Sequence, residues 1–164
     1  MSFKLISTEG MQRRPCPIDS TLSTTNITEG MFIAQIDAGT TFALPTAGEA
    51  NVYQVWTGKR TSGATIEQRT DVDAIIRSTA DAGENSGYAV ESGQVTGLFG
   101  QYIAETDQYN TDRTYAIGDA LVVTTTGILD NDAALVAAGT VIGYVDELVA
   151  NSDNDDHLRF RRVI

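Results

Sequence analysis

The stretch YAIGDALVVTTTGILDNDAALVAAGTVIGYV, residues 115–145, decides the fold class of this 164-residue chain. Residues 120–124 and 140–145 are rich in valine and other apolar or β-branched residues, which favour strands. Gly127 marks a turn after the first of these runs. Short apolar runs separated by glycine turns are typical of a β-sheet protein.

A short helix is expected inside the same stretch. Asp130 or Asp132 can accept hydrogen bonds from the following backbone N–H groups and so cap residues 133–138. Gly139 then stands where such a helix would end. We therefore expect a brief helical segment within an otherwise β-rich region.

Strand patterns continue on both sides of this stretch. Further strands are expected at residues 3–6, 31–36, 51–56, 98–105 and 158–164. Residues 51–56 alternate apolar and polar side chains, which predicts a strand with one solvated face. Residues 71–82 fit either an amphipathic helix or a buried strand, and both interpretations stay open. The chain as a whole predicts an all-β fold, a small β-barrel or β-sandwich with at most one or two short helices.

Residues 1–30 differ from residues 31–164, which we expect to form a single β-rich domain. Proline holds the run Arg13-Arg14-Pro15-Cys16-Pro17 extended, and the Ser/Thr-rich stretch after it has little to bury. We expect an extended N-terminal arm that orders against a neighbouring chain, with a solvated surface loop as the alternative. The lone Cys16 cannot form a disulfide within the chain, so packing or assembly must stabilise the fold.

Charge is unevenly distributed along the chain, whose net charge is −11. Residues 78–156 contain 14 acidic residues and one basic residue, whereas the remainder contains 8 acidic and 10 basic residues. This asymmetry indicates one solvated acidic surface and one near-neutral surface able to meet a partner, or simply a generally acidic protein. Because phosphate contacts need clustered Lys and Arg, no nucleic-acid partner is expected. Residues 1–10 lack a signal-peptide core and the longest interior apolar run, 133–145, is too short for a bilayer, so no membrane partner is expected.

No catalytic residue, cofactor or metal is expected. The single histidine, His157, lies beside an acidic loop, where a structural or exposed role is favoured over that of a general base. No glycine-rich phosphate-binding loop is present. Residues 130–132 and 153–156 offer oxygen ligands for Ca²⁺, but neither has the central glycine and final glutamate of an EF-hand loop. Solvated polar turns are the expected role of both clusters.

Residues 115–145 also resemble a layout found in capsid decoration (cement) proteins of tailed bacteriophages. The aromatic-x-x-Gly-Asp turn at 115–119 starts a strand, a hairpin follows at Gly127, and the Val-Ile-Gly-aromatic strand at 141–145 comes back across it. The similarity extends over residues 97–164. It implies a non-enzymatic protein, made in the host cytoplasm, that binds the major capsid protein on the outer capsid surface of the virion and staples neighbouring subunits.

The candidate residues for capsid or subunit contact combine positive charge with extended backbone. They are Arg13, Arg14, Pro15, Arg159, Arg161 and Arg162. In a C-terminal strand, Arg159 and Arg161 would point to one face and Phe160 and Arg162 to the other. Pairing within the chain and pairing across an interface both remain open for these arginines. We also expect self-association, with a trimer favoured over a dimer, because several weak sites then engage together.

Two other function classes remain as alternatives. A carbohydrate-binding β-sandwich module, on a virion or cell surface, would present Trp56 and Tyr53 exposed on one sheet face. A small hydrolase would need two carboxyl groups facing each other in an apolar cleft. Capsid decoration instead predicts broad, shallow contact surfaces, and the alternating pattern around Trp56 favours the core for this side chain.

Overall fold

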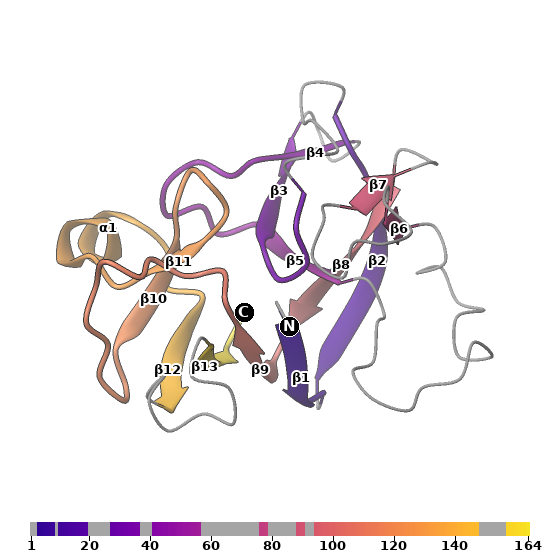
Figure 1. Cartoon of the computed structure of the whole chain (residues 1–164). Helices are drawn as coiled ribbons and strands as arrows, with labels where there is room; N and C mark the ends of the chain where they lie inside the picture. The colour runs from indigo at the N-terminus through magenta and orange to yellow at the C-terminus, as the bar shows by residue number, and fades with distance from the viewer. Residues whose placement is uncertain are drawn as a thin grey trace.

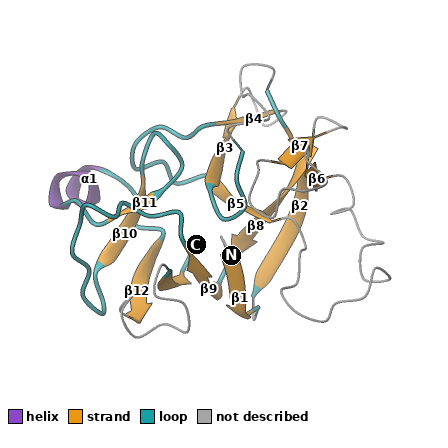
Figure 2. Cartoon of the chain, viewed as in Figure 1, coloured by secondary structure: helices purple, strands orange, loops and turns teal. Residues whose placement is uncertain are grey.

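The computed structural model describes residues 3–8, 10–19, 27–36, 41–56, 76–78, 88–90, 94–147 and 157–164. This part of the chain forms antiparallel strands and one short helix, α1 (Ala133–Ala138), as Figures 1 and 2 show. The prediction of an all-β fold with at most one or two short helices is confirmed.

Two antiparallel sheets make up most of the described chain. The six-stranded sheet has the order β1 (Phe3–Ser7), β9 (Tyr102–Thr106), β13 (Leu158–Arg162), β12 (Gly143–Glu147), β10 (Ala120–Val123) and β11 (Leu129–Asp130). The five-stranded sheet has the order β2 (Met11–Pro17), β8 (Gln94–Gly100), β5 (Val52–Trp56), β3 (Phe32–Ile36) and β4 (Thr41–Ala43). A separate hairpin consists of β6 (Ile76–Ser78) and β7 (Tyr88–Val90). Within the described residues, neither large sheet closes into a barrel.

The main hydrophobic core lies between the two large sheets. Alternate residues of β13 point into it, so Leu158 and Phe160 are buried while Arg159 and Arg161 lie on the opposite, outer face. Phe32 from the five-stranded sheet packs edge-on against Phe160, with the ring centroids 6.3 Å apart. Two sheets that bury their facing sides in one core form a sandwich, one of the two predicted architectures.

The five-stranded sheet is also buried on its far side. It curls until Ile18 forms a bridge with Phe42 of β4, and the Asp19 N–H donates to the Phe42 carbonyl oxygen at 2.8 Å. The curled sheet packs around a second apolar cluster, whose buried members are Cys16, Ile27, Met31, Ile33, Phe42, Tyr53, Val55 and Val95. Residues 52–55 are therefore buried on both faces, and the solvated face expected for residues 51–56 does not form.

Close packing in this second cluster explains why residue 97 is glycine. A Cβ atom on Gly97 would lie 2.6 Å from Cys16 Sγ, closer than such atoms approach, and in a tight contact of 3.0 Å with Tyr53 Cβ. Burial raises the pKa of the Cys16 thiol to about 12, and the neighbouring Arg14 charge partly opposes the shift. Cys16 is therefore a packed, protonated side chain.

The first strands of the chain belong to the two large sheets. β1 pairs with β9, and β2 pairs with β8 along its whole length. Residues 3–7 include the strand expected at 3–6, and residues 11–17 are extended, as the proline pattern predicts, but their partners are strands of the same chain. The interpretation of residues 1–30 as an arm that orders against a neighbour does not hold for these two strands. Pro15 and Pro17 fit β2 because it is an edge strand, where alternate N–H groups need no partner in the sheet.

A pair of glycines bends these strands from one sheet into the other. Only Gln101 separates β8 from β9, and Gly100 before it has φ +84°. A Cβ atom on Gly100 would collide with the carbonyl oxygen of Gly10, whose φ is +82°. The single strand expected at residues 98–105 is therefore two strands in different sheets, with the bend at Gly100.

A buried arginine links the two sheets. Arg162 of β13 is 2% exposed, and its Nη2 donates to the Val52 carbonyl oxygen of β5 at 2.5 Å. Its Nη1 lies 3.3 Å from the Leu98 carbonyl oxygen of β8 and 3.3 Å from the Tyr102 hydroxyl oxygen. The guanidinium group also lies over the Phe32 and Tyr102 rings, 5.7 and 5.6 Å from their centroids. One side chain thus contacts both sheets through hydrogen bonds and aromatic faces.

The network continues from Tyr102 into the five-stranded sheet. The Tyr102 hydroxyl donates to Gln54 Oε1 at 2.7 Å, and Gln54 Nε2 donates to the Gly30 carbonyl oxygen at 2.8 Å. Burial raises the pKa of Tyr102, while the Arg162 charge acts in the opposite direction. These buried polar side chains therefore satisfy one another, which is the condition for keeping them in a core.

Arg162→Met should destabilise the fold by about 3 kcal/mol, because it removes a buried guanidinium group that donates to two buried carbonyl oxygens. The matched control is Arg161→Met, one residue earlier and on the exposed face, which should cost less than about 0.5 kcal/mol when measured at a protein concentration where the chain is monomeric. Urea denaturation followed by tryptophan fluorescence measures both free energies of unfolding. Equal losses in the two variants would contradict the role given to Arg162.

Candidate functional site

The six predicted contact residues lie in two separate places. Three of them, Arg13, Arg14 and Pro15, are in β2 at the edge of the five-stranded sheet, and three, Arg159, Arg161 and Arg162, are in β13 inside the six-stranded sheet (Figure 1). The backbone of Pro15 pairs with Thr96, and its side chain lies outside the described part of the chain. The structure therefore does not gather the six residues into one site.

The two arginines of β2 contact aromatic rings of their own sheet. The Arg13 guanidinium lies 4.3 Å from the centroid of the Trp56 ring. Arg14 Nη1 lies 3.2 Å from the Tyr53 hydroxyl oxygen, and its guanidinium is 5.3 Å from the centroids of the Phe42 and Tyr53 rings. Cation–π contacts of this kind hold both side chains against the molecule.

Arg159 pairs within the six-stranded sheet. Its guanidinium forms ion pairs with Glu105 of β9 and Glu147 of β12, and its Nε donates to Glu105 Oε1 at 2.9 Å. Glu105 is 1% exposed, so the contact is a buried, charge-assisted one that spans three strands. For Arg159 the structure therefore provides the internal partners that the sequence left open.

Arg161 and Arg162 differ although they are neighbours in the sequence. Arg162 is enclosed in the core network, so this candidate is corrected: its side chain is not available to a capsid or to another subunit. Arg161 is exposed and lies opposite Ile103 and Tyr144. Among the residues that the structure describes, no carboxylate forms an ion pair with Arg161. Its charge is thus open to a partner.

Arg161 belongs to a row of side chains on the outer face of the six-stranded sheet. This outer row consists of Ile103, Arg161, Tyr144 and Ala120, which lie opposite one another on β9, β13, β12 and β10. Tyr144 is 37% exposed, and Ile103 and Ala120 are half-buried. Ile103 and Tyr144 are not among the contact residues predicted from the sequence, although the alternation of residues 143–147 indicates the direction of Tyr144: apolar Val145 points inward, so Tyr144 must point outward.

A tight turn beside β10 exposes an apolar side chain. In this Ile117 turn, residues 116–119, the Asp119 N–H donates to the Ala116 carbonyl oxygen at 3.0 Å and the Ala116 N–H donates to Asp119 Oδ2 at 2.9 Å. Gly118 has φ +89°, which glycine adopts without strain. Ile117 is 66% exposed, the largest value among the exposed large apolar side chains of the described chain.

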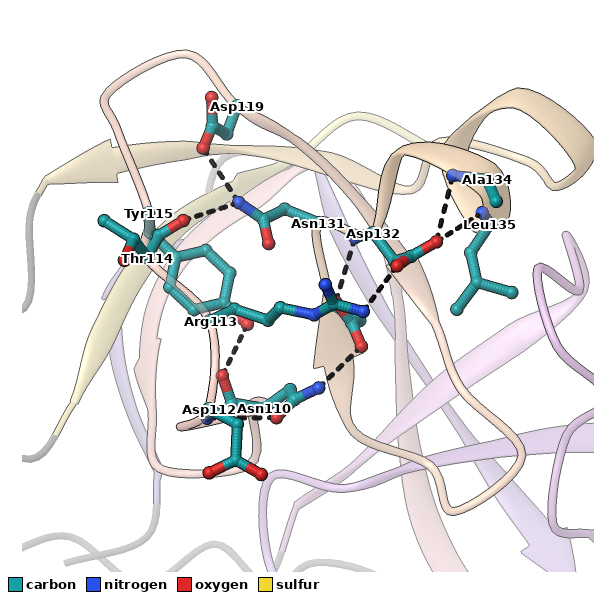
Figure 3. Close-up of polar contacts among 11 residues, drawn as sticks. Asn110, Asp112, Arg113, Thr114, Tyr115, Asp119, Asn131, Asp132, Ala134 and Leu135 are labelled. Atoms are coloured by element: carbon teal, nitrogen blue, oxygen red, sulfur yellow. Dashed lines mark hydrogen bonds and ion pairs between the residues drawn. The ribbon is translucent and has the colours of Figure 1, made fainter.

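Asp130, Asn131 and Asp132 lie in one polar network, in which Figure 3 labels Asn131 and Asp132. Asp130 is 4% exposed and accepts hydrogen bonds from Asn110 Nδ2 at 2.8 Å and from the Asp132 N–H at 2.9 Å. Arg113 forms ion pairs with both Asp130 and Asp132. The carboxylate oxygens already face N–H donors, an arrangement unlike the ligand shell of a cation.

Asp132 caps α1, as one of the two predicted alternatives requires. Its Oδ1 accepts from the Ala134 and Leu135 N–H groups at 2.9 and 3.1 Å, and Gly139 ends the helix. The Leu135 N–H, with that of Ala134 and the Arg113 charge, lowers the pKa of Asp132. No group of three or more His, Cys, Asp or Glu side chains among the described residues could hold a metal ion. The second acidic cluster, residues 153–156, lies outside the described residues.

His157 is 3% exposed and lies immediately before β13. Burial raises the pKa of Asp107, and the hydrogen bond from Gln108 and the nearby His157 charge act in the opposite direction. A buried histidine close to a carboxyl group at the start of a core strand occupies a structural position.

Asp132→Asn should destabilise the protein near neutral pH and leave its stability almost unchanged at about pH 2. The folded-state pKa of Asp132 is lowered, so its contribution is present above the unfolded-state pKa and is lost as the pH falls through the folded-state value. Thermal unfolding at the two pH values measures the difference. Asp112→Asn, at an exposed position in the same region, is the control, and an Asp132 effect independent of pH would contradict the assignment.

No helix of the described residues is long and apolar enough to cross a membrane. Comparison of the chain with protein families, with curated proteins and with solved structures found no match. Its own residues and their geometry are therefore the basis for any functional proposal.

Proposed function

We propose that this chain is a non-enzymatic capsid decoration protein. It binds the outer surface of an icosahedral phage capsid, contacts the major capsid protein and stabilises the contacts between capsid subunits. The decoration protein would stabilise the shell by mass action, because a protein that binds only the assembled shell shifts the equilibrium away from disassembly. Self-association would strengthen the binding, because several weak sites then engage one shell together.

The observation that carries the proposal is the arrangement of residues 115–145. The aromatic-x-x-Gly-Asp segment is a turn that leads into β10, and the chain reverses near Gly127 so that β11 pairs with β10. β12 then returns antiparallel to β10, with Leu121 opposite Gly143. This is the local layout on which the resemblance to decoration proteins rests, although β12 begins at Gly143, later than the expected strand at 140–145.

Glycines at two of these positions have local physical reasons. A Cβ atom on Gly127 would collide with the carbonyl oxygen of Phe32, and the Phe32 N–H donates to the Gly127 carbonyl oxygen at 2.7 Å. A Cβ atom on Gly143 would lie 2.6 Å from the Arg161 carbonyl oxygen. The glycine pattern of the resemblance therefore corresponds to close backbone approaches.

The exposed surface described above also suits binding without turnover. The outer row carries Tyr and Arg side chains, residue types enriched at protein contacts. The carboxylates of Asp130, Asp132 and Glu105 contact N–H donors or arginines, which gives them structural roles. These features favour a broad contact surface over a catalytic cleft.

The carbohydrate-binding alternative has less support. Tyr53 is 8% exposed and belongs to the second apolar cluster, while Trp56 is half-buried, packs against the main core and lies beside Arg13. The two rings therefore do not form an exposed aromatic platform, which is the sign that this function requires.

Binding of the purified protein to capsids that lack it tests the proposal. We expect saturable cosedimentation, density at symmetry-related sites on the outer surface in cryo-electron microscopy, and slower disassembly of the shell on heating. Capsids already saturated with the unlabelled protein are the control and should take up no labelled copy. Protein that stays in the supernatant at high concentration would contradict the capsid role.

A further inference from the structure

We propose that two copies of this chain associate through the Ile117 turn and the outer row, with the turn of each copy seated on the outer row of the other. The inference does not depend on the capsid role. It concerns a contact between copies of this chain, and it assigns each of the two surfaces a specific partner.

The Ile117 turn is a rigid support for an exposed apolar side chain. In addition to the two hydrogen bonds within the turn, the Gly118 N–H donates to the Val145 carbonyl oxygen at 2.9 Å. Asn131 Nδ2 donates to Asp119 Oδ2 at 2.9 Å, which ties the turn to the segment before α1. A turn whose backbone is fixed in this way loses little conformational freedom on binding, so Ile117 at its tip suits the role of an anchor.

The turn and the outer row have complementary chemistry. Asp119 in the turn and the exposed Asp146 near it form no ion pair with a cation among the described residues. The outer row offers the unpaired Arg161 beside the partly exposed Tyr144 and Ile103. An apolar anchor with acidic neighbours thus corresponds to a row of apolar and aromatic side chains that includes a guanidinium group.

The backbone prevents a copy from satisfying its own surfaces. The turn is fixed to β12 by the Gly118 contact and by the Val145 N–H, which donates to the Asp119 carbonyl oxygen at 2.9 Å. Ala120, directly after the turn, lies opposite Tyr144, so turn and row are neighbours along one side of the sheet. Ile117 nevertheless remains 66% exposed, which means that it does not fold back onto its own row.

A twofold axis satisfies both surfaces at once. Because turn and row are adjacent in each copy, a twofold rotation can place Ile117 of each chain against Tyr144 of the other and the acidic groups near Arg161. Such an isologous contact is closed at two copies, so the expected assembly is a dimer. The charge of −11 on each copy repels at long range, and the local pairing of Asp and Arg side chains opposes this repulsion.

Sedimentation equilibrium of the full chain at about 0.15 M salt tests the proposal. We expect a concentration-dependent dimer, and Ile117→Asp and Arg161→Glu should each weaken association by about tenfold or more. Leu44→Asp is the matched control, since Leu44 is an exposed apolar residue after β4, in the other sheet, and its replacement should leave the dimer unchanged. Far-ultraviolet circular dichroism must show that all variants are folded.

Reversing the charges of Asp146 and Arg161 tests the proposed ion pair between the two copies. Asp146→Arg alone should weaken the dimer, and the double variant with Arg161→Glu should restore it, because the ion pair is rebuilt with opposite signs. A double variant no better than the single ones would overturn the proposed contact. A chain that stays monomeric at about 100 μM, or forms a trimer insensitive to Ile117→Asp, would overturn it as well. If Ile117→Asp abolished capsid binding by a monomeric chain, the turn would face the capsid protein instead.

Discussion

The guanidinium group of Arg162 is the contact on which the arrangement of the two sheets depends. It donates to carbonyl oxygens of β5 and β8 in one sheet and contacts the Tyr102 hydroxyl in the other, while Phe32 and Tyr102 cover its faces. A buried charge is costly unless its donors are satisfied, and here the guanidinium donates to main-chain oxygens, including that of Ile164, and lies against ring faces. The same hydrogen bonds specify how the sheets lie against each other, because few other packings would satisfy all of them.

The position of Arg162 also determines the exposed face. Side chains alternate along β13, so placing Phe160 and Arg162 in the core puts Arg159 and Arg161 outside. Arg159 then pairs with Glu105 and Glu147, whereas Arg161, beside Tyr144, forms no ion pair with a described carboxylate. The surface that we propose for association between copies is therefore a direct consequence of how the core is built.

Much of the fold could be predicted from local patterns, and the misses share one cause. The strand at 31–36, the alternation of 158–164 and the helix cap depend on nearby residues; the first two appear as expected, and the cap is Asp132, one of the two alternatives. Contacts between segments far apart in the sequence could not be predicted. Strands β1 and β2 pair with strands of the same chain, and the curl of the five-stranded sheet buries both faces of β5. An arginine in an alternating strand predicts a solvent-exposed position, so the burial of Arg162 among carbonyl groups could not be inferred from the sequence. For the candidate site, the sequence identified the arginines of β13. Which of them lacks an internal partner depends on Glu105, which pairs with Arg159 and lies more than 50 positions earlier.

A double-mutant cycle between Arg162→Met and Tyr102→Phe measures whether the buried polar network holds the two sheets together. The four free energies of unfolding, from urea denaturation, give the coupling between a side chain that reaches the five-stranded sheet and one that relays the network to Gln54. If the network acts as one unit that holds the sheets together, the coupling energy should be about 1–2 kcal/mol. Additive losses, with a coupling energy near zero, would contradict this account and leave apolar packing alone to hold the two sheets together.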